Sequence, residues 1–430
     1  PPVPDSVKKE LARYGCVRHG TVFETWLESK MLIQTKFANT KQLHLVSAPA
    51  GYRKQLTFEN EPIGSVRRIP STANFIYSMD MGGDEYYRYY YFDSVAELPI
   101  CMSSSSDEKL KISAAPVISK TGQHLAYSIN KRGKEFDIWC VEMPPVGSEL
   151  AEYENLLDKA TLLALTPDPR QALRPEEWSP DGSQLLIRIT QGPSESRLAV
   201  VDVKMGLESK GHSGLRILEM EGNEPFAVSD LSTCEKASDS AVRFDDAKWL
   251  KDGSVILVSD ADSEFLTLRM WSKSQGLVHL TTPVKGTVPQ AHDVMDVKYH
   301  ADSGMVCYSL NEDGLISLYL MSLADVTRVE RIPDVLVGKV TLGNFSDDGQ
   351  QIAYTADSIQ CPGDVFVYNI ADGITTRWTF SETGPLKTNA FIAPTRLHYP
   401  TFDSPRKIPC WVYRPTSGQA PYPVVIYIHG

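Results

Sequence analysis

The chain has 430 residues, and 43 Lys and Arg stand against 54 Asp and Glu, which gives a formal net charge of −11. With 42% hydrophobic residues it can bury a sizeable core, which excludes wholesale disorder. The acidic balance without a Lys/Arg-rich run argues against nucleic acid and membrane surfaces as partners, and no apolar run approaches the ~20 residues of a membrane span.

A short helix is predicted over residues 5–14, ended by Gly15. From residue 21 a pattern then recurs: a short strand, a turn that often contains Asp-Gly, an apolar strand, a polar turn and a third strand. Asp-Gly supplies the positive φ that a tight hairpin needs. Seven copies begin about 45 to 71 residues apart, at the anchors Trp26, Ser71, Ile118, Trp178, Trp249, Tyr299 and Phe345.

These repeats predict a mainly β fold, a seven-bladed β-propeller. Repeats of about 40–50 residues with about four strands are propeller blades. A small antiparallel sheet buries both faces only by stacking on neighbours, and a closed ring leaves few free edges. Residues 277–281 and 374–379 are predicted fourth strands. We expect Trp178, Trp249 and Phe345 to be buried at equivalent positions in three blades.

The two longest spacings are predicted to hold insertions. Residues 148–157 predict a helix, because apolar side chains at helical spacing follow Ser148, which is a predicted N-cap. Residues 204–240 are polar and contain glycine, and therefore predict a surface loop.

The pattern changes in the last part of the chain. Residues 397–402 and 408–413 predict a hairpin, and a proline-rich loop follows. Residues 423–430 predict an apolar strand buried on both faces that ends His429-Gly430. This order of elements is typical of the start of an α/β-hydrolase domain. In that fold, the loop after this strand supplies a backbone N–H to the oxyanion hole.

A propeller with TolB-like blades followed by a strand ending His-Gly resembles the prolyl oligopeptidase family of serine peptidases. Residues 78–86 (Ser-Met-Asp-Met-Gly-Gly-Asp-Glu-Tyr) and 423–430 are most similar to its acylaminoacyl peptidase-like branch. The resemblance implies an N-terminal helical extension over residues 1–20, the propeller over 21–385 and a truncated start of the hydrolase domain over 386–430. It also implies that the first helix packs near 386–430 through Val7 and Leu11.

The resemblance implies peptide cleavage by acyl transfer, but no residue of the catalytic triad is identified in this chain. The family's nucleophile lies in a Gly-x-Ser-x-Gly turn, and no such pentapeptide occurs here. We therefore expect the triad beyond residue 430 and expect this chain alone to be inactive. His429 and Gly430 are predicted to begin the oxyanion loop.

Asp84 and Glu85 are the candidate substrate-binding residues. Some members of the family grip the free N-terminus of a peptide with an acidic pair; the alternative is a solvated turn. Glu176 and Glu177 are predicted to have a blade-edge role.

Seven scattered cysteines without a C-x-x-C spacing predict free thiols in a reducing, cytoplasmic compartment, and isolated histidines predict no metal. We predict no cofactor, while homo-oligomerisation stays open. A peptide is the expected partner. Two alternatives to the peptidase remain: a non-enzymatic propeller that serves as a binding scaffold, and an esterase or other acyl hydrolase of the same architecture.

Overall fold

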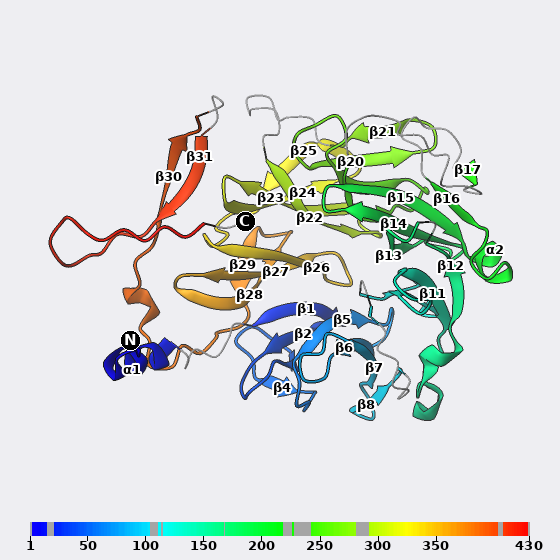
Figure 1. The fold of residues 1–430 in the computed structure, drawn as a ribbon, viewed down its shortest axis with the longest axis horizontal. Coiled ribbons are helices and arrows are strands. Elements are labelled where there is room, and N and C mark those ends of the chain that lie inside the picture. The colour runs from blue at the N-terminus through cyan, green and yellow to red at the C-terminus, as the bar shows by residue number, and fades with distance from the viewer. Residues whose placement is uncertain are drawn as a thin grey trace.

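The computed structural model describes residues 2–14, 21–103, 111–112, 115–166, 168–217, 226–227, 242–280, 292–402 and 407–428. From β1 to β29 these residues form seven antiparallel sheets arranged in a ring (Figure 1). Strand order within every sheet follows chain order, so each blade comes from one continuous segment. The predicted seven-bladed propeller is confirmed.

The strands of blades 1 to 3 are β1 (Val22–Leu27), β2 (Lys30–Thr35), β3 (Gln42–Val46), β4 (Arg53–Gln55), β5 (Ile63–Arg68), β6 (Phe75–Met79), β7 (Arg88–Asp93), β8 (Leu98–Cys101), β9 (Val117–Ile118), β10 (His124–Ile129), β11 (Asp137–Glu142) and β12 (Thr161–Ala164). Blades 4 and 5 contain β13 (Ala172–Trp178), β14 (Gln184–Gly192), β15 (Glu195–Asp202), β16 (Leu215–Ile217), β17 (Phe226–Ala227), β18 (Phe244–Trp249), β19 (Val255–Ser259), β20 (Thr267–Ser272) and β21 (Gly276–His279). Blades 6 and 7 contain β22 (Asp293–His300), β23 (Met305–Glu312), β24 (Leu315–Ser322), β25 (Asp325–Arg331), β26 (Lys339–Phe345), β27 (Gln351–Ser358), β28 (Cys361–Asn369) and β29 (Ile374–Arg377).

The repeated turns and anchors behave as their sequence predicts. The glycines of the three Asp-Gly turns, Gly182, Gly253 and Gly349, have φ of 73°, 83° and 69°. The anchors Trp178, Trp249 and Phe345 lie in β13, β18 and β26 and are 0%, 6% and 8% exposed. Both predictions are confirmed.

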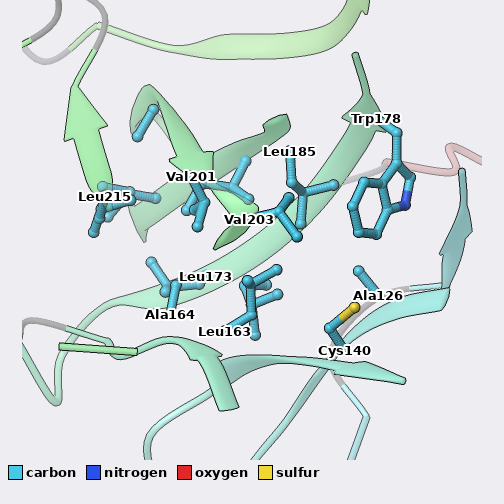
Figure 2. Packing of buried hydrophobic residues seen from close by; sticks show 14 residues of the cluster. Ala126, Cys140, Leu163, Ala164, Leu173, Trp178, Leu185, Val201, Val203 and Leu215 are labelled. Carbon is cyan, nitrogen blue, oxygen red and sulfur yellow. The ribbon is translucent and has the colours of Figure 1, made fainter. Parts of the chain in front are cut away.

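The hydrophobic core lies between adjacent sheets. Figure 2 shows this packing between blades 3 and 4, where Trp178 faces Ala126 and Cys140 and where Leu163 lies opposite the aliphatic side chains of blade 4. The indole Nε1 of Trp178 donates to the carbonyl of Val117 at 3.1 Å, so the buried N–H is satisfied. Each sheet therefore buries both faces only because another sheet lies on either side.

Blades 7 and 1 meet without exchanging a strand. The Thr21 N–H donates to the Gly363 carbonyl at 2.8 Å, and the Phe23 N–H donates to Thr355 Oγ1 at 2.9 Å. Trp26 contacts Trp378 edge to face at a centroid distance of 5.6 Å. Side-chain and backbone contacts thus close the ring.

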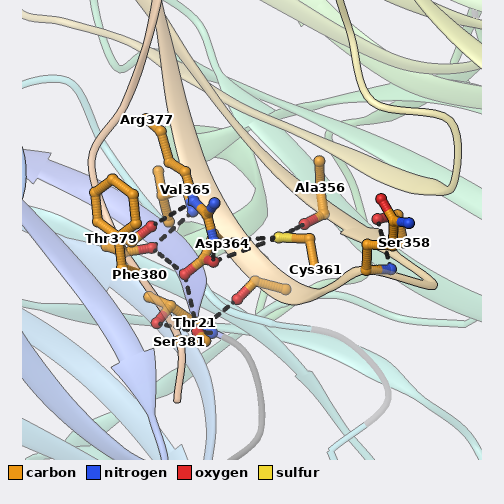
Figure 3. A network of polar contacts seen from close by, with 12 residues as sticks. Thr21, Ala356, Ser358, Cys361, Asp364, Val365, Arg377, Thr379, Phe380 and Ser381 are labelled. Carbon is orange, nitrogen blue, oxygen red and sulfur yellow. Dashed lines mark hydrogen bonds and ion pairs between the residues drawn. The ribbon is translucent and has the colours of Figure 1, made fainter. Parts of the chain in front are cut away.

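Asp364 is the centre of a polar network at this seam (Figure 3). It is fully buried, forms an ion pair with Arg377, and accepts hydrogen bonds from the hydroxyls of Thr379 at 2.7 Å and Ser381 at 2.8 Å. The Cys361 thiol donates to its other oxygen at 3.4 Å. The buried carboxylate is therefore fully compensated.

The helix predicted over residues 148–157 is wrong. The segment forms two short 3-10 helices, η1 (Leu150–Glu152) and η2 (Leu156–Lys159), separated by Asn155 with φ of 51°. The N–H groups of Asn155 and Leu157 donate to the carbonyls of Cys101 and Met102, which replaces helical hydrogen bonds with bonds to blade 2. Ser148 does not cap either helix; the residue at the cap of η1 is Glu149.

The loop predicted over residues 204–240 is also partly wrong. Its described part contains α2 (Val203–Glu208), capped by the Asp202 side chain, and the strands β16 and β17. These two strands extend blade 4, which therefore has five strands.

The predicted first helix is α1 (Asp5–Tyr14). The Tyr14 ring stacks on Phe391 at a centroid distance of 6.3 Å, next to η4 (Thr388–Ala390), so α1 contacts the predicted region. Val7 and Leu11 are 44% and 59% exposed, so their predicted packing role is wrong. None of the helices in the described parts of the chain is long and apolar enough to cross a membrane.

The predicted hairpin is confirmed as β30 (Thr395–Pro400) paired antiparallel with β31 (Lys407–Val412). Figure 1 shows it projecting from the ring. The strand predicted over 423–430 is wrong for its described part: residues 422–428 lie in no strand, and the side chains from Val424 to Ile428 are 78–93% exposed. An apolar run becomes a buried strand only beside other strands, and the described residues contain no α/β-hydrolase sheet for it to join.

Candidate functional site

The hairpin marks one face of the propeller. Arg396 Nη1 donates to the Glu312 carbonyl at 2.8 Å, and His398 Nε2 lies 3.3 Å from Asp313 Oδ2. Glu312 and Asp313 are at the connection between the second and third strands of blade 6. Because the strands alternate in direction, this face also carries the equivalent connections of the other blades and the beginnings of all first strands. We call it the hairpin face.

The first strands are innermost, because most of them contact the first strands of both neighbouring blades around the ring. In six of the seven described blades this strand has a break in its register, between residues 23/25, 63/66, 175/177, 245/248, 294/296 and 342/345. A bulge leaves a residue out of the ladder and turns the strand. Glu24, Glu176 and Asp246 are at such breaks, which places acidic residues along the inner wall.

A cavity of about 430 Å³ lies where the inner strands of blades 4, 5 and 6 meet. Its wall is mostly charged and is formed by Glu176, Arg188, Arg243, Asp245, Asp246, Leu266, Asp293, Val294, Met295, Asp296 and Lys298. Many of these residues lie at the beginnings of first strands, so the cavity belongs to the hairpin face.

Ion pairs and backbone hydrogen bonds organise this wall. Arg188 pairs with Glu176 at 2.8 Å and also with Asp245. Asp246 pairs with Lys248 at 2.9 Å and accepts from the Val297 N–H at 2.6 Å, which joins blade 5 to blade 6. The charged groups are therefore held in fixed positions by neighbouring blades.

Burial and neighbouring charges shift the pKa values in opposite directions. Burial raises the pKa of Glu176 against the effect of Arg188, and burial together with the nearby Asp246 charge raises the pKa of Asp296. Burial opposes ionisation of Asp246 and Lys248 as well, but their opposite charges outweigh it, so the pKa of Asp246 is lowered and that of Lys248 is raised. The inner wall thus combines a stable ion pair with carboxyl groups that hold their protons more strongly.

Glu24 occupies the inner wall of blade 1. Burial raises its pKa to about 8, although the positive charges of Arg67 and Lys41 act in the opposite direction. The charge of this carboxyl therefore changes near neutral pH.

The acidic pair predicted from sequence lies in blade 2, at the connection between β6 and β7 on the hairpin face. Asp84 Oδ1 accepts from the N–H groups of Met81 at 3.2 Å and Tyr86 at 3.0 Å, so this carboxylate holds its own turn. Glu85 is 74% exposed and lies 3.7 Å from Lys111. Neither residue lines a cavity described here. His429 and Gly430 lie outside the described residues.

Glu177 has a structural position. It pairs with Lys120 of blade 3 at 2.8 Å and accepts from the Trp249 N–H of blade 5 at 2.6 Å, so it connects three blades. The blade-edge role predicted for it is confirmed. Glu176, in contrast, lies in the cavity wall with Arg188, a contact that the sequence did not indicate.

Sequence reasoning missed the charged inner wall as a site. The available signal was the occurrence of charges such as Arg174, Glu176, Asp246 and Lys248 just before buried anchors, where a strand of the core is normally apolar. Their convergence depends on blade packing.

The described cysteines, Cys101, Cys140, Cys307, Cys361 and Cys410, are free thiols, as predicted, while Cys16 and Cys234 lie outside the described residues. Within the described ranges, no three His, Cys, Asp or Glu side chains are grouped as metal ligands.

No protein-family model and no curated protein sequence matches this chain. Solved structures match it over 94% of its length. One, from a mechanistic study of two prolyl endopeptidases, has 13% identity, a TM-score of 0.66 and 55% of its own length covered. A puromycin hydrolase variant has 13% identity, a TM-score of 0.67 and 59% coverage. Oligopeptidase B from Trypanosoma brucei, with covalently bound antipain, has 14% identity, a TM-score of 0.61 and 55% coverage.

These structural neighbours are prolyl oligopeptidase family peptidases, matched over the propeller region. The resemblance read from the sequence is therefore confirmed at the level of the fold. The chain spans little more than half the length of the structures that it matches.

Proposed function

We propose that this chain is the propeller portion of a serine peptidase of the prolyl oligopeptidase family, which cleaves short peptides by acyl transfer. The observation that carries the proposal is the match of 94% of the chain to peptidase structures with TM-scores of 0.61 to 0.67. The similarity of residues 78–86 to the acylaminoacyl peptidase-like branch favours substrates of that class.

The end of the described chain supports a second domain. The hairpin β30–β31 follows the last blade, and the side chains from Val424 to Ile428 are almost fully exposed. A run of this kind is stable in water only when another surface covers it. We propose that residues 386–430 belong to an α/β-hydrolase domain, that His429 and Gly430 begin its oxyanion loop, and that the triad lies beyond residue 430.

The hairpin face supports a role of the propeller in binding and admitting the substrate. The charged cavity at the inner strands lies on this face, so a peptide held there would be next to a domain that follows the hairpin. Charged and polar wall groups suit the amide and ionic groups of a peptide. Both acidic residues are exposed on this face, but the Asp84 carboxylate holds its own turn, so Glu85 is the residue that could attract a peptide ammonium group.

Labelling with a fluorophosphonate tests where the nucleophile lies. Acyl transfer needs a serine, an aligned base and preformed N–H donors. We expect the 430-residue chain to show no labelling. Robust labelling would mean that a serine within residues 1–430 is catalytic and would overturn the proposed position of the triad.

The coding sequence and the complete enzyme separate the remaining alternatives. We expect the reading frame to continue into a Gly-x-Ser-x-Gly turn and the enzyme to cleave acyl-aminoacyl and peptide p-nitroanilides. A continuation without this turn would favour the binding scaffold. Hydrolysis of simple esters without peptide hydrolysis would favour the esterase.

A further inference from the structure

A second cavity, of about 510 Å³, lies beside the first, between blades 4 and 5. Three arginines line it, Arg174, Arg188 and Arg243, together with a single acidic residue, Asp245. The lining therefore carries two more positive than negative charges, in a chain whose net charge is −11. This local reversal of sign needs a physical explanation.

The strand register places these donors on one face of blade 4. Arg174 of β13 is directly opposite Arg188 of β14. Thr190 lies two residues further along β14, so its side chain points to the same side of the sheet. Like charges directly opposite each other destabilise a sheet. Folding therefore places two guanidinium groups together at a cost in stability.

Only part of this positive charge is compensated within the protein. Asp245 pairs with both Arg188 and Arg243, and Glu176 pairs with Arg188. Among the described residues, the buried Arg174 Nε and the buried Thr190 Oγ1 have no hydrogen-bond partner. Buried donors without acceptors are rare in folded proteins and call for a ligand or solvent.

Contacts that hold blades 4 and 5 together are made by residues other than Arg174, among them Ser196. The Ser196 hydroxyl donates to the Phe244 carbonyl at 3.0 Å and accepts from the Phe244 N–H at 2.8 Å. This hydroxyl is therefore already engaged. Among the described residues, Arg174 forms no hydrogen bond or ion pair with blade 5, so a role in joining the blades does not explain it.

We propose that the cavity between blades 4 and 5 binds a carboxylate of a peptide ligand, with the Arg174 guanidinium and the Thr190 hydroxyl as its donors. The planar guanidinium group matches the two oxygens of a carboxylate. When Glu176 is counted with Asp245 against the three arginines, one positive charge remains, which suits a carboxylate better than a dianionic phosphate. The volume is in the range of pockets that hold small ligands.

This proposal rests on the proposed function, because it names the peptide group that the propeller recognises. The carboxylate belongs either to an acidic side chain or to the C-terminus of the peptide. Both sources present the same chemistry to Arg174, and blocked peptides separate them.

Isothermal titration of the 430-residue chain with four probes tests the proposal. The probes are Ac-Ala-Glu-Ala-amide, Ac-Ala-Ala-Ala with a free C-terminus, the uncharged Ac-Ala-Gln-Ala-amide, and inorganic phosphate. We expect at least one carboxylate peptide to bind about tenfold or more tightly than the uncharged peptide, and its identity shows the source of the carboxylate. Equal binding of all three peptides, no binding of any, or tighter binding of phosphate would overturn the proposal.

Variants connect the binding to the site. We expect Arg174→Gln to weaken binding of the carboxylate peptide about tenfold, Thr190→Val to weaken it less, and Arg174→Lys to restore part of it. Arg328→Gln is the matched control, since Arg328 is an exposed arginine of blade 6 paired with Glu330. Unchanged binding by Arg174→Gln would overturn the proposal.

Thermal unfolding of the same variants excludes a merely structural role. Removing one of two opposed guanidinium groups should leave the melting temperature unchanged or raise it, whereas loss of a structural contact would lower it. The titration measures binding without turnover, so a positive result supports the carboxylate site even if the complete enzyme cleaves no peptide. A negative titration overturns the carboxylate site only, and the peptidase assay still tests the proposed function.

Discussion

Buried charge is fully compensated at the seam between blades 7 and 1, whereas it is only partly compensated in the cavity between blades 4 and 5. At the seam, Asp364 is surrounded by one cation and several donors that match its lone pairs (Figure 3). In the cavity, Arg174 faces a second arginine and its Nε has no partner among the described residues.

The difference separates a structural charge from a charge that is available to a ligand. A compensated network holds two blades together, since removing either partner leaves the other buried and unpaired. A surplus of donors does not hold blades together, but it gives an incoming acceptor partners in fixed positions. The following experiments test this distinction, beginning with the variant that should change stability most.

Asp364→Ala should have the largest effect. It removes a fully buried carboxylate and takes this acceptor away from Arg377 and the Thr379 hydroxyl, so we expect a loss of about 3–5 kcal/mol in the free energy of unfolding. Urea unfolding measures it. Asp302→Ala is the control: Asp302 is exposed and paired with Lys251, and its removal should leave the free energy of unfolding almost unchanged. Similar losses in the two variants would contradict the assignment of the seam as structural.

Glu24→Gln should change the dependence of stability on pH. The folded state keeps this proton until about pH 8, while an unfolded glutamate ionises near 4.5, so wild-type stability falls as the pH rises between these values. Glutamine stays neutral throughout. We therefore expect the variant to be about 2 kcal/mol more stable than the wild type at pH 9 and no more stable at pH 4. If the free energies of unfolding of the wild type and the variant differed by the same amount at every pH from 4 to 9, Glu24 would be solvated in the folded state.

Ser196→Ala should destabilise the cavity wall without changing ligand binding. The alanine removes the hydroxyl that donates to the Phe244 carbonyl and accepts from the Phe244 N–H, and we expect a loss of about 1–2 kcal/mol in urea unfolding. The titration with carboxylate peptides should give the wild-type affinity. This combination is the reverse of that expected for Arg174→Gln. A Ser196→Ala variant that loses binding at unchanged stability would contradict the division of roles within the wall.

Glu85→Gln should have the smallest effect on stability. The carboxylate is 74% exposed and its contact with Lys111 is long, so we expect a change below about 0.5 kcal/mol in thermal or urea unfolding. Asp84→Ala is its matched comparison, because Asp84 holds the turn through two backbone N–H groups and should cost about 1 kcal/mol. Equal losses would mean that Glu85 also holds the turn.

The ring of blades could be predicted from the sequence, because each blade is a local structure. The Asp-Gly turns, the apolar second strands and anchors such as Trp178 and Trp249 all lie within one continuous segment of about four strands. Their pattern can be read without knowing what lies beside them. The helix α1 and the hairpin β30–β31 were predictable for the same reason.

Features that depend on contacts between blades could not be predicted from the sequence, because they form only in the folded ring. Residues 148–157 have a helical pattern, yet backbone bonds to blade 2 divide them into two short 3-10 helices. The run from Val424 to Ile428 has the composition of a buried strand, yet it stays exposed where no sheet is beside it. Arg174 and Arg188 are 14 positions apart in sequence and are brought together by strand register. Blade packing adds Arg243, so the arginine cluster of this candidate site could not be predicted from local sequence.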